Sequence, residues 1–146
     1  SLQEQEWKKK YCCLVFGKMK EKKGTINLAL ERQSHGEKMK VGRGKKAITH
    51  YEVEKEFAET SFLRVLLETG RTHQIRCHFT AIDHPLVLDR QHGDFQKNRT
   101  FRTMHGLRRL FLHAEYLTFS HPESGKEIAL HAPLPADLVN ALSRLS

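Results

Sequence analysis

The feature that most constrains the fold is a pair of β-strand patterns, at residues 47–57 and 61–67, separated by only three residues. The first, AITHYEVEKEF, alternates in a way that is typical of a strand buried on one face. The second, SFLRVLL, is mostly apolar and predicts a more deeply buried strand. Because residues 58–60 leave room only for a short turn, the two strands are expected to pair as a hairpin.

The segment TGRTHQIRCH, at residues 69–78, predicts a turn that leads into a helix. Gly70 allows the turn, Thr72 is a suitable N-cap, and Pro85 limits the helix to residues 73–83. Helical spacing gives a buried stripe and a second, polar face, which consist of Ile75, Phe79 and Ile82 and of His73, Arg76 and Thr80. Free N–H groups at a helix start favour anions, so this cationic corner is expected to bind phosphate.

Other patterns predict further strands and a closing helix. Strands are expected at residues 11–16, 25–30, 110–120 and 127–131, the last two as a hairpin around HPESGK. The tail from residue 135 carries Leu138, Leu142 and Leu145 at helical spacing. Residues 31–46 predict a glycine-containing loop, and residues 89–109 are polar and basic. These patterns predict one α+β domain with a mixed, mainly antiparallel sheet and flanking helices.

Positive charge is concentrated in one part of the chain. The formal net charge is +8, and residues 18–46 contain ten lysines and arginines against three glutamates, a local net charge of +7. A chain with this charge binds polyanions through counterion release, whatever its fold. Residues 18–46 are therefore either an arm that binds phosphate groups or a solvated surface segment.

The remaining reactive groups form no recognisable metal or nucleophile motif. The ten histidines and three cysteines include no CxxC or HxxxH pair, so no metal is expected. Cys77 and His78 are neighbours on the expected helix and face different directions, which argues against a Cys–His nucleophile. Cys12 and Cys13 are adjacent, which makes them a poor disulfide pair. No apolar run reaches the roughly 20 residues that span a membrane. We therefore expect a cytoplasmic protein.

Several segments together resemble the RluA-type RNA pseudouridine synthases, in the order in which that family has them. These are KKKYCCLVFG, GRGKKAITHYEV, LETGRTHQIRCH, DHPLVLDRQHGD and GLRRLFLHAEYLTFSHPESGKEIALHAPLP. The resemblance covers nearly the whole chain and is closest to the C-type synthases of bacterial 23S ribosomal RNA. It implies an isomerase that breaks the N1–C1′ bond of uridine, rotates the base and rejoins it through C5. It also implies a flipped target nucleotide in an RNA-binding cleft, without a metal or organic cofactor.

Three residues correspond to the reacting site of that family. Tyr11 matches the tyrosine that lies against the flipped base, although by residue type alone it reads as a core tyrosine on a strand. Arg76 matches the arginine that pairs with the catalytic aspartate, whereas by position alone it is a surface arginine of a helix. Leu112 matches an apolar residue packed at the pocket, a role close to that of any core residue.

The resemblance implies RNA contacts or cleft support for a larger set of residues. They are Lys45, Arg71, Thr72, His73, Gln74, Arg108 and Arg109. A histidine at a helix start, such as His73, is as often a structural hydrogen-bond donor as a ligand. The paired arginines at 108 and 109 either reach RNA or lie in solvent.

One departure from the family concerns the nucleophile. The family's attacking aspartate lies in an HRLD-type segment some tens of residues before the position of Tyr11, and no such segment occurs in these 146 residues. Asp89 and Asp94 match a region that is structural or RNA-facing in the family. We therefore expect residues 1–146 to be the C-terminal part of one catalytic domain, without the aspartate segment and without an S4-like RNA-binding domain. The chain alone is then either an inactive part of an enzyme or a non-catalytic RNA-binding remnant.

Overall fold

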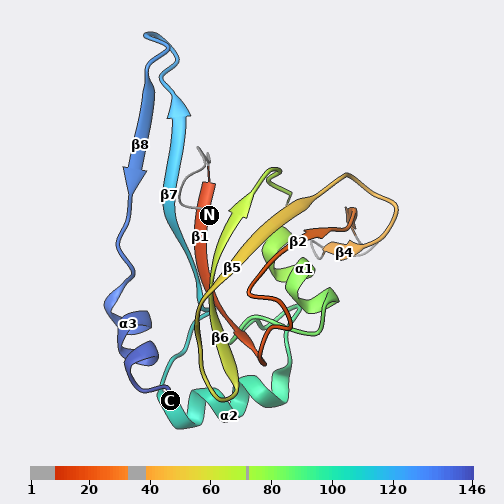
Figure 1. Ribbon diagram of the computed structural model, residues 1–146, viewed down its shortest axis with the longest axis vertical. Coiled ribbons are helices and arrows are strands. Elements are labelled where there is room, and N and C mark those ends of the chain that lie inside the picture. The colour runs from red at the N-terminus through yellow and green to blue at the C-terminus, as the bar shows by residue number, and fades with distance from the viewer. Residues whose placement is uncertain (1–8, 33–38, 72) are drawn as a thin grey trace.

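The computed structural model describes residues 9–32, 39–71 and 73–146 and contains a six-stranded sheet (Figure 1). In sheet order the strands are β2 (Lys23–Asn27), β5 (Ile48–Glu56), β6 (Thr60–Leu67), β1 (Lys9–Phe16), β7 (Leu112–Ser120) and β8 (Glu127–His131). A separate two-stranded sheet contains β3 (Leu30–Arg32) and β4 (Met39–Val41). The helices are α1 (Gln74–Ala81), α2 (Phe95–His105) and α3 (Ala136–Ser143). The neighbouring strands pair antiparallel, which confirms the expected α+β class.

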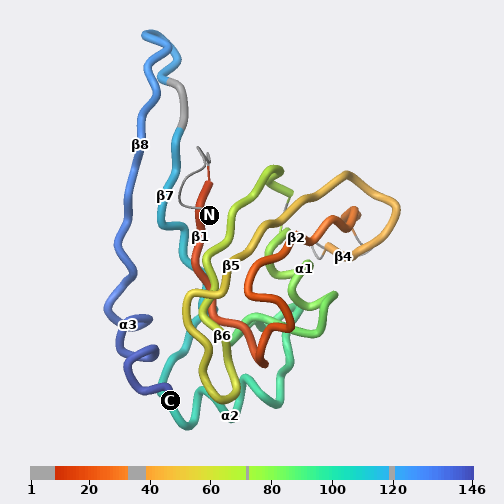
Figure 2. The backbone as a smooth tube through the Cα atoms, in the orientation of Figure 1, coloured from red at the N-terminus to blue at the C-terminus, as the bar shows by residue number. Residues whose placement is uncertain are grey.

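Both hairpins predicted from the sequence are present. Tyr51 of β5 lies opposite Val65 of β6, and Thr118 of β7 lies opposite Ala129 of β8. Figure 2 shows that the β7–β8 hairpin projects beyond the rest of the sheet. β1 is the first described strand in the chain but lies inside the sheet, between β6 and β7.

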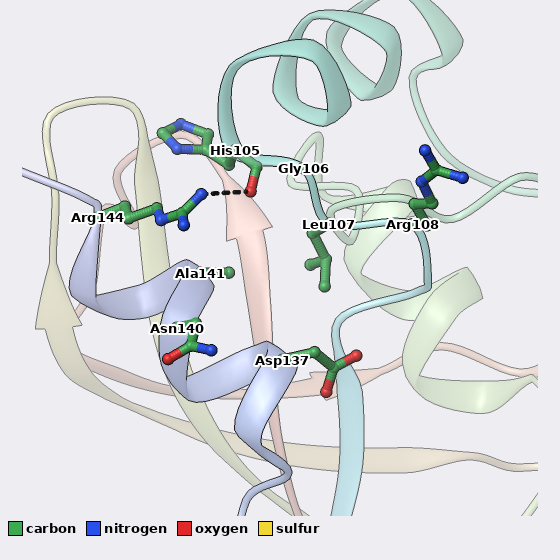
Figure 3. A pocket seen from close by; sticks show the side chains of 8 residues that line it. All are labelled: His105, Gly106, Leu107, Arg108, Asp137, Asn140, Ala141 and Arg144. Atoms are coloured by element: carbon green, nitrogen blue, oxygen red, sulfur yellow. Dashed lines mark hydrogen bonds between the residues drawn. The ribbon is translucent and has the colours of Figure 1, made fainter.

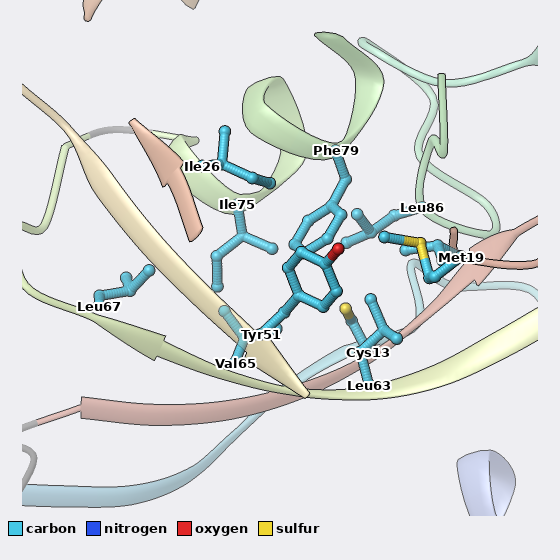
Figure 4. Packing of buried hydrophobic residues seen from close by; sticks show 11 residues of the cluster. Cys13, Met19, Ile26, Tyr51, Leu63, Val65, Leu67, Ile75, Phe79 and Leu86 are labelled. Atoms are coloured by element: carbon cyan, nitrogen blue, oxygen red, sulfur yellow. The ribbon is translucent and has the colours of Figure 1, made fainter. Parts of the chain in front are cut away.

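Alternate residues of β1 contribute to two separate hydrophobic clusters, one on each face of the sheet. Cys13 and Val15 belong to the cluster that α1 covers, where α1 contributes Ile75 and Phe79. Figure 4 shows the ring of Phe79 against that of Tyr51, and the two meet edge to face at 5.7 Å between centroids. We call this side of the sheet the α1 face.

The opposite side of the sheet is covered by α2 and α3, and we call it the α2–α3 face. Leu14 and Phe16 of β1 pack there with Phe101 of α2 and Leu138 of α3. The rings of Phe16 and Phe101 are 6.2 Å apart and nearly perpendicular. The sheet is thus the middle layer of a three-layer fold, as its buried residues on both faces require.

The chain after α1 returns to the sheet beside the end of β1. Phe16 donates its N–H to the carbonyl of Pro85 at 2.9 Å, and Val87 donates to the carbonyl of Leu14 at 2.9 Å. Residues 85–87 therefore extend the hydrogen bonding of β1 beyond its pairing with β7. This attachment fixes where the loop after residue 87 begins.

α1 is shorter than predicted and begins and ends within the range 73–83. The expectation that Thr72 caps it is wrong, because the N-cap is His73; Thr72 itself lies outside the described residues. His73 has a left-handed φ of 53°, so the regular helix begins only at Gln74. The side chain of Gln74 instead accepts the backbone N–H of Arg71 at 3.1 Å.

Two regular elements lie where only loop or polar sequence was expected. α2 occupies part of residues 89–109; only Asn98 and Phe101 are buried in it, so its sequence lacks an apolar stripe. The β3–β4 pair begins at Leu30 and otherwise lies within residues 31–46, of which residues 33–38 are outside the described part of the chain. The strand expected at residues 25–30 corresponds to β2, which begins and ends earlier.

Candidate active site

Tyr11 lies half-buried on the α1 face of the sheet. It packs against the same hydrophobic cluster as Leu112 of β7 and Ile75 of α1. On the neighbouring strands, Val65 and Ala114 lie opposite it, and the register with β7 shifts just before Tyr11. Burial raises the pKa of Tyr11, so its phenol is protonated at neutral pH. The side chain thus combines an aromatic surface with an O–H group on the side where α1 lies.

Arg76 of α1 forms a two-point ion pair with a buried carboxylate. Its Nε donates to Oδ2 of Asp89 at 2.9 Å and its Nη2 donates to Oδ1 at 2.7 Å. Nη2 also donates to Oε1 of Gln91 at 3.2 Å. The Asp89 side chain is 0% exposed, whereas that of Arg76 keeps 16% of its surface exposed. A buried charge requires such a partner, so these residues hold each other in place.

The backbone of the same loop completes the environment of Asp89. Its Oδ1 also accepts the N–H groups of Gln91 and His92, at 3.0 and 2.9 Å. Burial alone would raise the pKa of Asp89, but these hydrogen bonds and the Arg76 charge outweigh it and lower the pKa. The carboxylate is therefore ionised at neutral pH.

The polar face of α1 predicted from the sequence packs against the loop at residues 89–92. Thr80 donates its hydroxyl to the carbonyl of His92 at 2.8 Å, and the rings of His73 and His92 are in hydrogen-bond contact at 3.2 Å. His73, Arg76 and Thr80 are the three side chains that were expected to share one face of this helix. His73 thus has a structural contact, one of the two roles considered for it.

Gln74 is a buried support and not a surface contact. It is 2% exposed, and its Oε1 accepts the hydroxyl of Thr69 at 2.7 Å as well as the backbone N–H that precedes the helix. Its Nε2 donates to the carbonyl of Ile48 and to the hydroxyl of Thr49, each at 2.9 Å. All donors and acceptors of the amide are in use, which ties the start of α1 to β5.

Arg71 and Lys45 lie near the start of β5. Arg71 donates Nε to the carbonyl of Lys46 at 2.9 Å, which leaves the rest of its guanidinium without a hydrogen bond among the described residues. Lys45 exchanges backbone hydrogen bonds with Leu30, and its side chain is exposed. The cationic side chains expected around this corner are therefore present at the surface.

Arg108 and Arg109 differ in their environments. Arg109 forms a two-point ion pair with Asp137 of α3, with distances of 2.7 and 2.8 Å. Arg108 is exposed, and no ion pair holds its side chain within the described ranges. Arg108 lines a pocket of about 380 Å³ between α2 and α3, with His105, Gly106, Leu107, Asp137, Asn140, Ala141 and Arg144 (Figure 3). This pocket belongs to the α2–α3 face, whereas Tyr11 and α1 lie on the other side of the sheet.

Cys77 of α1 is buried beside the same loop. Burial, aided by the charge of Asp89, raises the pKa of its thiol to about 11, and the thiol donates to the carbonyl of Met39 at 3.2 Å. A protonated thiol of this kind is a poor nucleophile. Across residues 9–32, 39–71 and 73–146, no group of three or more histidine, cysteine or acidic side chains has metal-binding geometry.

No helix in the described part of the chain is long and apolar enough to cross a membrane.

The structure thus gathers some of the predicted site residues and separates others. Tyr11, Leu112 and α1 share one face, whereas Arg108 and Arg109 lie toward the pocket between α2 and α3. The role of Asp89 as the partner of Arg76 was not predicted from the sequence. No local pattern gives this contact, because the two residues are thirteen positions apart and the intervening loop brings them together.

Comparison with known proteins gives consistent family matches. Residues 1–81 match a family model described as RNA pseudouridylate synthase. An uncharacterized RNA pseudouridine synthase of Mycobacterium bovis is 40% identical over 139 residues, covering 94% of this chain and 44% of that protein. Ribosomal large subunit pseudouridine synthase D of Vibrio cholerae is 40% identical over 147 residues, covering 95% and 45%. Ribosomal large subunit pseudouridine synthase C of Buchnera aphidicola is 32% identical over 148 residues, covering 99% and 47%.

Solved structures agree with this assignment. Human RNA pseudouridylate synthase domain containing 1 superimposes with a TM-score of 0.74 and 27% identity, covering 87% of this chain and 54% of that one. Human RNA pseudouridylate synthase domain containing 4 superimposes with a TM-score of 0.72 and 22% identity, covering 94% of this chain and 62% of that one. At this identity the match supports the fold alone. The chain spans less than half the length of the three bacterial synthases named above. It belongs to the RNA pseudouridylate synthase family and to the RluA type within it.

Proposed function

We propose that this chain is part of a cytoplasmic RNA pseudouridine synthase that isomerises specific uridines of 23S ribosomal RNA. The observation that carries the proposal is the pairing of Arg76 with Asp89 on the face of the sheet that also holds Tyr11. The names of its relatives, large-subunit synthases of types C and D, support a ribosomal substrate. Because both types match, the similarity does not narrow the substrate to that of the C type.

The proposed reaction is an isomerisation and needs no external oxidant or reductant. The N1–C1′ bond of the uridine breaks, the base rotates, and C5 forms the new bond to C1′. The hydrogen on C5 leaves as a proton, and N1 ends with one. Tyr11 would lie against the base, with its O–H available for proton transfer. Arg76 would orient the attacking carboxylate and keep it ionised.

The proposed RNA contacts follow from exposure and charge. Lys45, Arg71 and Arg108 have cationic groups at the surface and would bind phosphate groups. Leu112 would form an apolar wall beside the base, because it packs with Tyr11 against one cluster. Arg109 would contribute less, because Asp137 already neutralises it.

We further propose that the attacking carboxylate is not among these 146 residues. Asp89 pairs with Arg76, Asp137 pairs with Arg109, and Asp94 caps α2 by accepting the N–H of Lys97 at 3.0 Å. The fourth aspartate, Asp83, is exposed just after α1. The 146-residue chain is therefore expected to be inactive alone, and to become active when extended upstream through an HRLD-type segment.

Tritium release tests this proposal directly. Ribosomal RNA labelled with tritium at C5 of uridine would be incubated with the 146-residue chain and with the extended chain. We expect release to water from the extended chain only. Release from the short chain alone would show that one of its own groups attacks and would refute the assignment of the nucleophile.

A non-catalytic RNA-binding remnant is the second candidate, and the engagement of three of the chain's four aspartates favours it. In that case neither chain would release tritium, yet the short chain would retard the RNA in a filter-binding assay. This pair of results would overturn the enzymatic proposal and leave the binding function.

A further inference from the structure

Asp89 is more deeply buried than the acidic partner in the protein's other two-point ion pair. The protein contains a second arginine–aspartate pair of the same two-point kind, between Arg109 and Asp137, but there the side chains are 45% and 50% exposed. The Asp89 side chain has no exposed surface. A surface pair of that geometry contributes little to stability, whereas a buried pair fixes both partners.

Several backbone contacts hold the turn around Asp89 in place. Leu88 has a left-handed φ of 64°, and its N–H is accepted by Oδ1 of Asn98 at 2.8 Å. The amide of the same Asn98 donates to the carbonyl of Asp89 at 2.8 Å. Gly93 allows the loop to close, since a Cβ there would lie 2.4 Å from that carbonyl. α2 therefore clamps the turn from which the Asp89 carboxylate extends.

This arrangement leaves one edge of the Arg76 guanidinium unused. Nε and Nη2 are occupied by Asp89, and Nη2 also reaches Gln91. Nη1 has no hydrogen bond among the described residues, and the side chain retains some exposure. A guanidinium is planar, so fixing two of its nitrogens also fixes the direction of the third.

We propose that Asp89 is a positioning residue that presents the Nη1 edge of Arg76 to a second carboxylate. This inference rests on the proposed function, in which that carboxylate attacks the substrate. Because Asp89 already neutralises Arg76, the second carboxylate meets directed N–H groups and not an uncompensated cation. It is oriented without being locked into a full ion pair, which keeps it available as a nucleophile.

Kinetics on the extended chain test the proposal. Asp89→Asn keeps the shape of the side chain but loses its charge and one acceptor. We expect kcat to fall about 100-fold, as for other displaced catalytic groups, with the KM for RNA within about twofold. In an Arg76→Gln background, Asp89→Asn is expected to lower kcat less than about threefold, because Asp89 acts through Arg76 and that arginine is gone.

Thr80→Val is the matched control. It removes the 2.8 Å hydrogen bond from α1 to the same loop but leaves the Arg76–Asp89 pair intact. We expect kcat to stay within about twofold of wild type. If Thr80→Val lowered kcat as much as Asp89→Asn, or if Asp89→Asn cost the same in both backgrounds, attachment of the loop would explain the effect and the proposal would be wrong.

Side-chain NMR of the 146-residue chain provides a readout that does not need activity. With ¹⁵N-labelled arginine, the Nη1 and Nη2 signals of Arg76 are expected to be resolved in wild type and averaged in Asp89→Asn. Formate, a minimal carboxylate, is expected to shift Nη1 more than Nη2. Resolved signals in Asp89→Asn, or no preference for Nη1, would overturn the positioning role. An extended wild-type chain without tritium release would instead refute the proposed function.

Discussion

At the scale of single residues, the start of α1 is organised by a chain of hydrogen bonds with a defined direction. Gln74 donates to the hydroxyl of Thr49, which lies 2.7 Å from Nδ1 of His78. Nε2 of His78 lies 2.8 Å from the carbonyl of Leu28, which can only accept. Nε2 therefore carries the proton, and Nδ1 accepts from Thr49. All of these hydrogen bonds require His78 to be neutral.

The neutrality of His78 predicts a pH dependence of stability. Burial lowers its pKa below the ordinary value, so the unfolded chain binds a proton more readily than the folded one. The contribution of His78 to the free energy of unfolding is complete above about pH 6.5, and it is lost as the pH falls from there toward the lowered pKa. Urea unfolding should show that the free energy of unfolding falls more between pH 7 and pH 5 for wild type than for His78→Gln. Equal losses would mean that the histidine is protonated when folded.

The two arginine–aspartate pairs predict unequal costs of mutation. Asp89→Ala leaves the half-buried Arg76 without its buried partner, so the free energy of unfolding is expected to drop by about 3 kcal/mol. Asp137→Ala also removes a two-point ion pair, the one with Arg109, but at the surface. It is therefore expected to change the free energy of unfolding little. Urea titration of both variants tests this. Similar costs would show that burial does not distinguish the pairs.

Residue roles were predictable only in part. The positions of Tyr11 and Arg76 follow from sequence segments that resemble the family, and the structure places Tyr11 on the α1 face. The pairing of Arg76 with Asp89 could not be predicted, because it depends on the left-handed turn at Leu88 and on a clamp from α2. No pattern in the sequence records either contact.

At the scale of elements, α2 shows what an apolar pattern cannot reveal. Its sequence FQKNRTFRTMH buries little, but its ends carry recognisable caps: Asp94 accepts the N–H of Lys97, and Gly106 follows with a left-handed φ of 71°. These are common N-cap and C-terminal signals. The hairpins and the closing helix were predictable, because their periodicity and turns are local.

The cap at Gly106 gives a prediction for α2. An alanine there must adopt a positive φ, although no atom would meet its Cβ within 4 Å. Gly106→Ala is therefore expected to lower the free energy of unfolding by about 1–2 kcal/mol through backbone strain alone. Gly106→Asn should cost less, since asparagine tolerates this conformation. Equal costs for both in thermal unfolding would argue against strain as the cause.

At the scale of the whole molecule, the charge of +8 predicts RNA binding that depends on salt. Arg108→Ala should weaken binding and reduce the slope of log K against log salt by about 1, because this cation has no ion-pair partner in the described part of the chain. Arg109→Ala should change the slope less, because Asp137 neutralises the neighbouring arginine. Filter binding at several salt concentrations measures both. Equal slopes would show that ion pairing does not decide which arginine reaches RNA.

The order of strands in the sheet also has a consequence for how the chain folds. β1 is flanked by β6 and β7, whose pairing residues are about fifty and a hundred positions further along the chain. Loop closures of this length make sheet formation slow. During synthesis, one edge of β1 stays bare until β7 has emerged, and a bare edge is prone to pair with other chains. Nascent chains arrested at residue 110 should therefore be more sensitive to protease and more prone to aggregate than chains arrested beyond residue 131.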